Sequence, residues 1–80
     1  SSDLHRRLGE IYLKKRDFSR SVYELEMVYN DFNSDPRFLN TLALVYLAMN
    51  DKNKARKCID RIEAVESAYP GLEKLRSFVN

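Results

Sequence analysis

The sequence has few of the residues that mark disulfide-rich, loop-rich or membrane proteins. It contains one cysteine, two glycines and two prolines. The single Cys58 excludes an internal disulfide and fits a reducing compartment without establishing one. So few glycines and prolines argue against a loop-rich or all-β fold. The longest stretch without a charge, Phe38 to Asn50, is shorter than the roughly 20 apolar residues that span a bilayer, so no membrane insertion is predicted.

An excess of charge of either sign is also lacking. Fourteen lysines and arginines stand against twelve aspartates and glutamates, and the net charge of +2 is too weak to imply nucleic-acid binding. Eighty residues make one domain and exclude a multidomain enzyme. Because 44 % of the residues are hydrophobic and 32 % are charged, the composition predicts a globular rather than a disordered chain.

The sequence does have a strong helical period. Apolar residues recur at the spacing of one helix face, as at Leu4, Leu8 and Ile11, and no stretch alternates like a strand. The second helix is expected to run from Phe18 to Phe32. Breakers are expected at residues 16–17, 33–36, 50–51 and 69–71. The third stretch, 38–49, is apolar except for Asn40 and Thr41, so we expect it to be a central helix covered on most sides.

Residues that favour helix N-termini stand where these helices should begin. The expected N-caps are Ser2 or Asp3, Asp17, Asp35 and Asp51. Pro36 follows its cap in the first turn, where a missing N–H is harmless, and Pro70 is expected to open the last helix in the same way.

The sequence also repeats itself after 34 residues. Leu8, Gly9 and Tyr12 fall on Leu42, Ala43 and Tyr46. In the following helix, Asp17, Ser21, Leu25 and Val28 fall on Asp51, Ala55, Ile59 and Ile62. Two-helix units with this period predict a helical-repeat architecture.

These motifs resemble the tetratricopeptide repeat (TPR) family. The first copy reads Leu8-Gly9-x-x-Tyr12, then Asp17-Phe18, Ser21, Leu25 and Val28. The second copy reads Leu42-Ala43-x-x-Tyr46, then Asp51-Lys52, Ala55, Ile59 and Ile62, with Lys52 in place of the aromatic Phe18. His5 and Leu39 stand where the family often has tryptophan. The resemblance implies an all-α, right-handed solenoid with two helix-turn-helix hairpins and a C-terminal capping helix. The single domain 1–80 would divide into repeats 2–35 and 36–69 and a capping helix 70–80.

Small residues at matching positions predict where the paired helices approach most closely. Gly9 would face Ser21 in the first hairpin, and Ala43 would face Ala55 in the second. The capping helix is expected to cover an apolar surface built from Tyr46, Ile59 and Ile62. Its own polar residues would form the outer end of the array; these are Glu73, Lys74, Arg76 and Ser77.

The sequence offers little for catalysis, so no catalytic residue, metal site or cofactor is predicted. His5 and Cys58 are each the only residue of their kind, and no third group at a suitable spacing completes a nucleophilic or metal-binding set. His5 is expected to pack or to be half exposed on the first helix, and Cys58 to act as a small buried hydrophobe. Both glycines stand alone, so no phosphate-binding loop is present.

The resemblance to TPR proteins implies a partner-binding concave groove lined by the first helix of each hairpin. The matching residues here are Arg6, Glu10, Leu13, Arg37, Asn40, Leu44 and Leu47. The expected function is therefore protein–protein interaction without catalysis. The expected partner is a protein or peptide with an acidic residue and an apolar anchor, because Arg6 and Arg37 would lie above Leu44.

Two alternatives remain open at this point. Leu44 and Leu47 could instead form the seam of a homodimer within a larger assembly. The weakest alternative is nucleic-acid binding through the basic segment 52–61, which would need a one-sided basic patch.

Overall fold

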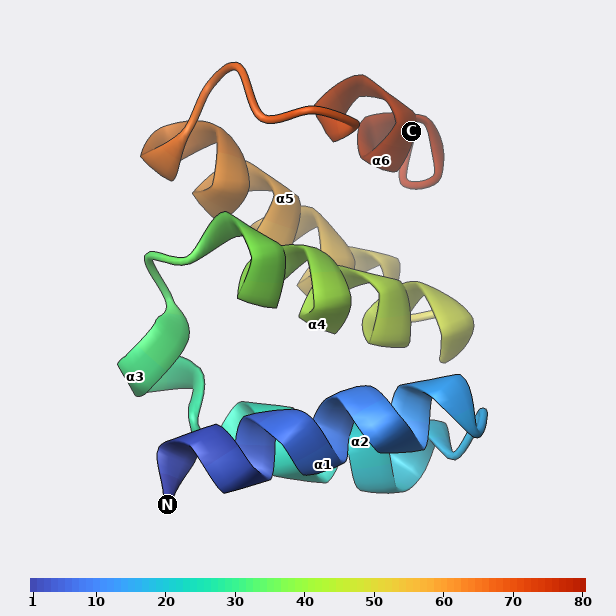
Figure 1. Ribbon diagram of the computed structural model, residues 1–80. Helices are drawn as coiled ribbons and strands as arrows, with labels where there is room; N and C mark the ends of the chain where they lie inside the picture. The colour runs from blue at the N-terminus through green and yellow to red at the C-terminus, as the bar shows by residue number, and fades with distance from the viewer.

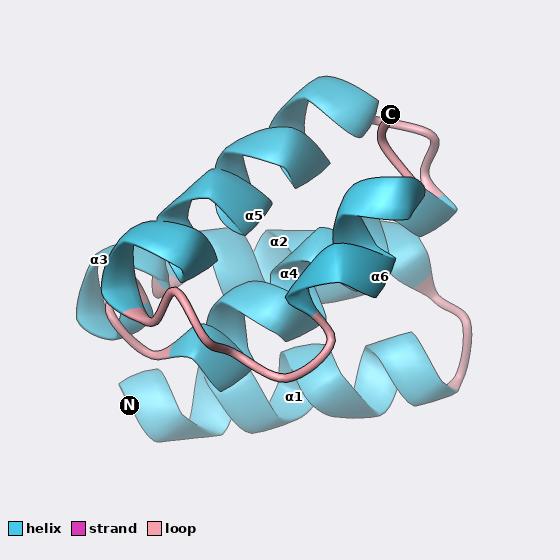
Figure 2. Cartoon of the chain, turned by 90° about the horizontal axis from the view of Figure 1, so that it is seen from above, coloured by secondary structure: helices cyan, strands magenta, loops and turns pink.

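All six secondary-structure elements of this chain are helices. A computed structural model describes residues 1–80 (Figures 1 and 2). The helices are α1 (Ser2–Lys14), α2 (Phe18–Met27), α3 (Tyr29–Phe32), α4 (Pro36–Ala48), α5 (Lys52–Val65) and α6 (Leu72–Ser77). The predicted all-α class is confirmed. None of these helices combines the length and the apolar character needed to cross a membrane.

Four helices begin at a side chain that accepts a backbone hydrogen bond. Asp17, Asp35 and Asp51 cap α2, α4 and α5, as expected, and Pro36 occupies the first turn of α4. The cap of α1 was misassigned, because Ser1 rather than Ser2 or Asp3 accepts the bond from the Leu4 N–H. These carboxylates and hydroxyls satisfy N–H groups that have no partner inside the helix.

The turns that follow α1 and α4 have the same backbone geometry. Arg16 and Asn50, which are 34 residues apart, both adopt a left-handed conformation, with φ of 61° and 59°. The next residue in each turn donates its N–H back to a tyrosine carbonyl, at 2.9 Å from Asp17 to Tyr12 and at 2.8 Å from Asp51 to Tyr46. Such bonds satisfy carbonyls at the helix end and reverse the chain.

The helices form two antiparallel pairs, which lie in successive layers in Figure 1. We call α1 with α2 the first hairpin and α4 with α5 the second hairpin. Helix α4 packs on its own partner α5 and on α2 of the first hairpin, while α6 packs on α5. Each hairpin therefore buries one face of its neighbour.

The first hairpin has a close contact between its helices at Gly9, as predicted. A Cβ placed on Gly9 would lie 2.4 Å from Cδ2 and 2.5 Å from Cγ of Leu25, so any side chain here would force the buried Leu25 to shift. The buried Ser21 hydroxyl donates a 2.7 Å hydrogen bond to the Gly9 carbonyl. At the matching positions of the second hairpin, Ala43 and Ala55 are fully buried.

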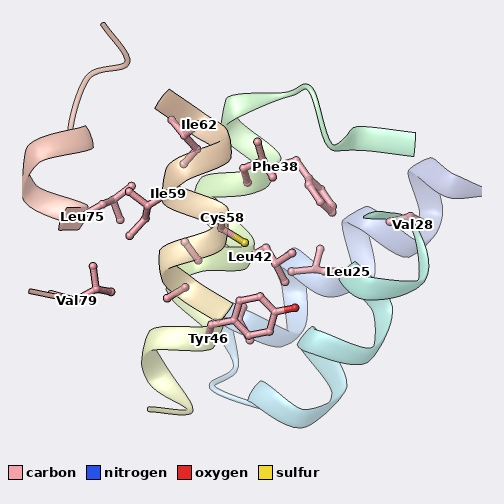
Figure 3. Packing of buried hydrophobic residues seen from close by; sticks show 14 residues of the cluster. Leu25, Val28, Phe38, Leu42, Tyr46, Cys58, Ile59, Ile62, Leu75 and Val79 are labelled. Atoms are coloured by element: carbon pink, nitrogen blue, oxygen red, sulfur yellow. The ribbon is translucent and has the colours of Figure 1, made fainter. Parts of the chain in front are cut away.

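The hydrophobic core is centred on α4, which is buried more extensively than any other helix. Figure 3 shows Phe38 and Leu42 between α2 and α5. Six residues of α4 are buried, which confirms the expected central helix. These residues are Phe38, Leu39, Leu42, Ala43, Val45 and Tyr46.

The second predicted helix is divided at Val28 rather than continuous to Phe32. Val28 has φ −111° and ψ 16°, and it separates α2 from the short α3. The break turns Tyr29 and Phe32 toward Phe38, with ring centroids 6.4 and 5.4 Å from that ring. Aromatic packing between the hairpins thus outweighs the local periodic pattern that predicted one helix.

The last helix is shorter than predicted. Pro70 does not open it; Gly71, with φ 88°, precedes Leu72 as the first helical residue. The positive φ suits glycine, which has no Cβ to clash with its own backbone. Leu75 and Val79 are buried against the second hairpin, next to Ile59 in Figure 3.

Two details of the predicted cap are wrong. The Tyr46 ring points toward α2 and away from Leu75 and Val79, so α6 does not cover it (Figure 3). Arg76 does not belong to a polar outer end, because its guanidinium donates to Asp60 and Glu63 and ties α6 to α5. The residue pattern within α6 could not predict these bonds, because the long Arg76 side chain reaches carboxylates on another helix.

Candidate functional site

The predicted partner-binding residue Arg6 is already engaged inside the protein. Its Nη1 donates a 2.8 Å bond to Asp35, its Nε lies 3.4 Å from Glu10, and its guanidinium stacks 4.8 Å from the centre of the Phe32 ring. Burial alone would raise the pKa of Asp35, but the bonds from Arg6 and from the Arg37 backbone outweigh it and hold that pKa below its usual value. Arg6 therefore joins the first hairpin to the cap of α4.

The remaining predicted residues divide by exposure. Leu13 and Leu47 are half-buried and pack against the core. Asn40 is half-buried, whereas Arg37 is exposed and 39 % of Leu44 is exposed. Arg37 and Leu44 are seven residues apart on α4 and thus lie on one helix face. They are the members of the predicted set that offer a free cation and an accessible apolar group.

None of the seven predicted residues lines a cavity. The largest hollow, about 780 Å³, lies between the end of α5 and α6 and is lined mainly by polar groups, including Glu63 and Arg76. A hollow of about 330 Å³ is formed where α2, α4 and α5 meet. Its lining is formed by Glu26, Tyr29, Leu42, Tyr46, Lys54, Lys57 and Cys58.

Sequence reasoning missed this second hollow. The Tyr46 hydroxyl donates to Glu26 at 2.5 Å, and Lys54 Nζ lies 3.9 Å from the same carboxylate. A buried tyrosine needs a hydroxyl partner, which signals that a polar group exists nearby. The sequence could not indicate that this group is Glu26, because the two residues come from different hairpins.

Burial and the negative charge of Glu26 control the titratable groups at this hollow. Burial, together with the Glu26 hydrogen bond, raises the pKa of Tyr46 far above its usual value. Burial also raises the pKa of the Cys58 thiol to about 12, with a smaller contribution from Glu26. Cys58 is therefore a neutral thiol at physiological pH, and the nucleophilic thiolate form is suppressed.

The basic segment 52–61 is largely committed to contacts within the protein. Arg56 donates to the Val79 carbonyl at 2.6 Å, and Arg61 donates to the Asn33 carbonyl at 2.7 Å. Lys54 pairs with Glu26. These contacts connect α5 to the C-terminal residues after α6, to the loop 33–35 between the hairpins, and to α2.

His5 is half-buried on α1, in line with the expectation that it packs or is half exposed there. Its Nδ1 lies 2.6 Å from Glu24 of α2, a distance at which the ring N–H donates to the carboxylate. The structure brings together no group of three or more His, Cys, Asp or Glu side chains that could hold a metal ion. Comparisons with family models, curated proteins and solved structures find no match to this chain.

Proposed function

We propose that this chain is a non-catalytic protein-interaction module of TPR-like architecture, and that it binds a peptide segment of a partner on the face of α4 that carries Arg37 and Leu44. The exposed Leu44 is the observation that carries the proposal. Contact with an apolar group of a ligand would remove the remaining exposed surface of this side chain from water and so favour binding.

The layered pairing of the helices supports the proposed architecture. The turns after α1 and α4 are alike, α2 packs on its own partner α1 and on α4, and α6 packs on α5. In an array of this kind, each layer contacts only its neighbours, and the first helices of successive hairpins share one side. Arg6 on α1 contacts Asp35 at the start of α4, which agrees with such neighbours.

Charge on this face supports a ligand with an acidic residue. The charge of Arg6 is already balanced by Asp35 and Glu10, so Arg37 is the cation left to meet a ligand. Leu44 would contact the apolar anchor two turns along the same helix. The sequence suggested that Arg6 and Arg37 both contact a ligand. Arg6 instead links α1 to the start of α4, and only Arg37 is left exposed for a ligand.

The test is selection of binding peptides from a random displayed library on the full chain. We expect the selected peptides to combine an acidic residue with an apolar one. Leu44→Asp should weaken their binding about tenfold or more, because a carboxylate would be buried unpaired against the anchor. Arg37→Glu should weaken it less, since rim charges contribute modestly.

Circular dichroism of both variants controls for folding, and Ile11→Asp on another part of the surface is the matched substitution. Light scattering across a concentration range separates this proposal from the alternative of a homodimer seam at Leu44 and Leu47. Peptides that bind the two α4 variants as tightly as the wild type would contradict the proposed site.

A further inference from the structure

The outer side of the first hairpin exposes apolar residues that have buried counterparts in the second hairpin. Leu4 and Ile11 have 55 and 39 % of their surface exposed, and Met27 of α2, whose counterpart is the partly exposed Arg61, has 48 % exposed. A shift of 34 residues carries Leu4 and Ile11 onto Phe38 and Val45, which are fully buried. We call this outer face the surface formed by Leu4, Leu8, Ile11, Tyr12, Arg20 and Met27.

Helix α2 and the adjoining α3 are what cover the equivalent face of the second hairpin. Phe38 meets the rings of Tyr29 and Phe32, and Tyr46 donates its hydroxyl to Glu26. The segment α2–α3 thus covers the second hairpin with apolar side chains and with one carboxylate, that of Glu26. The second hairpin therefore shows which kind of surface complements this face.

The outer face also has polar residues at the positions that correspond to Tyr46 and Lys54, the two residues that contact Glu26 in the second hairpin. Tyr12 corresponds to Tyr46, and Arg20 corresponds to Lys54, which pairs with Glu26. Both residues contact Asp17: the Asp17 N–H donates to the Tyr12 carbonyl at 2.9 Å, and Arg20 Nη1 donates to the Asp17 carboxylate at 2.8 Å. The Arg20 side chain remains 72 % exposed beside this one partner, so a carboxylate positioned like that of Glu26 could meet both a hydroxyl donor and this guanidinium.

We propose that the outer face of the first hairpin binds an amphipathic α-helix of a partner protein, which lies across α1 as α2 lies across α4. The partner helix presents apolar residues to Leu4, Leu8 and Ile11. It presents a glutamate or aspartate to Tyr12 and Arg20. This surface is separate from the Arg37–Leu44 face of α4.

A second copy of the chain does not have its α2 free to serve as the occupant. The segment with the required pattern, α2, is already buried against α4 in every copy. Its core residue Leu25 is fully buried, so presenting α2 to another molecule would open the core that holds the hairpins together. The occupant is therefore a helix whose apolar stripe is free in the partner.

The probe for this proposal is a labelled synthetic peptide with the sequence of residues 17–33, stapled between Ser19 and Tyr23 to hold it helical. Both of these side chains are exposed in α2. A staple is needed because an isolated helix of this length is marginal in water. Fluorescence anisotropy against the full 80-residue chain measures the affinity.

We expect saturable binding that Ile11→Asp weakens about tenfold or more, with an equal helical content of the variant as the folding control. A peptide with Gln at the Glu26 position should bind several-fold more weakly, and most of that loss should vanish against a Tyr12→Phe/Arg20→Ala chain. Leu44→Asp, on the face of the proposed function, should leave the affinity unchanged.

Three results would overturn the proposal. The first is no binding at millimolar peptide. The second is binding that ignores Ile11, which would mean that the peptide displaces the protein's own α2. The third is a concentration-dependent dimer that Ile11→Asp abolishes while the peptide fails to bind, which would assign the face to a second copy.

Discussion

The two hairpins follow one backbone plan but make their closest contact with different chemistry. In the first, Gly9 lets Leu25 approach, and the Ser21 hydroxyl bonds to the Gly9 carbonyl. In the second, the equivalent Ala43 and Ala55 are fully buried and carry no polar side-chain group. The first hairpin thus has a buried side-chain hydrogen bond at positions where the second has only apolar methyl groups.

A second pair of equivalent positions is also polar in the first hairpin and apolar in the second. His5 and Glu24 form a partly buried polar pair in the first hairpin. Their counterparts in the second hairpin are both buried: Leu39 is fully buried, and Cys58 is only 4 % exposed. A polar pair keeps part of its hydration only at a surface, whereas apolar groups gain from full burial.

The difference follows from what lies on either side of each hairpin. The second hairpin is covered by α2 on one side and by α6 on the other, while the first has only α4. One sequence pattern can therefore create a buried interface or an exposed one, depending on the neighbours.

Removing residues 70–80 should have the largest effect, because it would leave the second hairpin uncovered on one side, as the first now is. Leu75 and Val79 would no longer be buried, nor would Arg76 bridge Asp60 and Glu63. Burial of two such side chains contributes about 3–6 kcal/mol. We expect urea unfolding, followed by circular dichroism, to show a loss of this size or aggregation.

The matched control for the truncation is Phe78→Ser, because Phe78 is 49 % exposed and should contribute little. A truncated protein that stays monomeric with an unchanged melting curve would show that α6 is a tail and that the second hairpin needs no cover.

Truncating one residue of a matched pair compares the two hairpins directly. Phe38→Ala should destabilise the protein by about 3–5 kcal/mol, because the ring is fully buried. Leu4→Ala, at the equivalent exposed position, should change the free energy of unfolding by about 0.5 kcal/mol or less. Equal losses in chemical denaturation would mean that Leu4 is covered in solution.

Gly9→Ala tests the close approach in the first hairpin. The new methyl group would collide with Leu25, and overpacking of about 1–3 kcal/mol should outweigh a gain of up to about 1 kcal/mol in helix propensity. Thermal melting should therefore show a net loss. In a double-mutant cycle, Leu25→Val should reduce the effect of Gly9→Ala, and simple additivity would argue against the contact.

The smallest expected effect is the pH dependence contributed by Cys58. Its pKa is raised to about 12 in the folded protein, so the unfolded chain loses its thiol proton first as the pH rises. Folding stability should be about 1.5–2 kcal/mol lower at pH 10 than at pH 8 from this group. Cys58→Ala should remove that part of the slope, and an identical pH slope in the variant would contradict the raised pKa.

Local features of the fold could be predicted from the sequence because they depend on neighbouring residues. The caps at Asp17, Asp35 and Asp51, the helical class and the close approach at Gly9 all follow from spacing and residue type. The left-handed turn at Asn50 suits asparagine, but Arg16 adopts the same conformation without any such preference. Position in the repeat, not residue type, determines that turn.

Features that join the hairpins were decided only by the tertiary structure. The sequence indicated that Arg6 is a cation on α1 and that Tyr46 needs a hydroxyl partner, but not that they would bond to Asp35 and Glu26. Long side chains reach groups far away in the sequence, and the relative rotation of packed helices selects which ones. The same rotation breaks the second helix at Val28, because aromatic packing across the layers outweighs a local preference for one continuous helix.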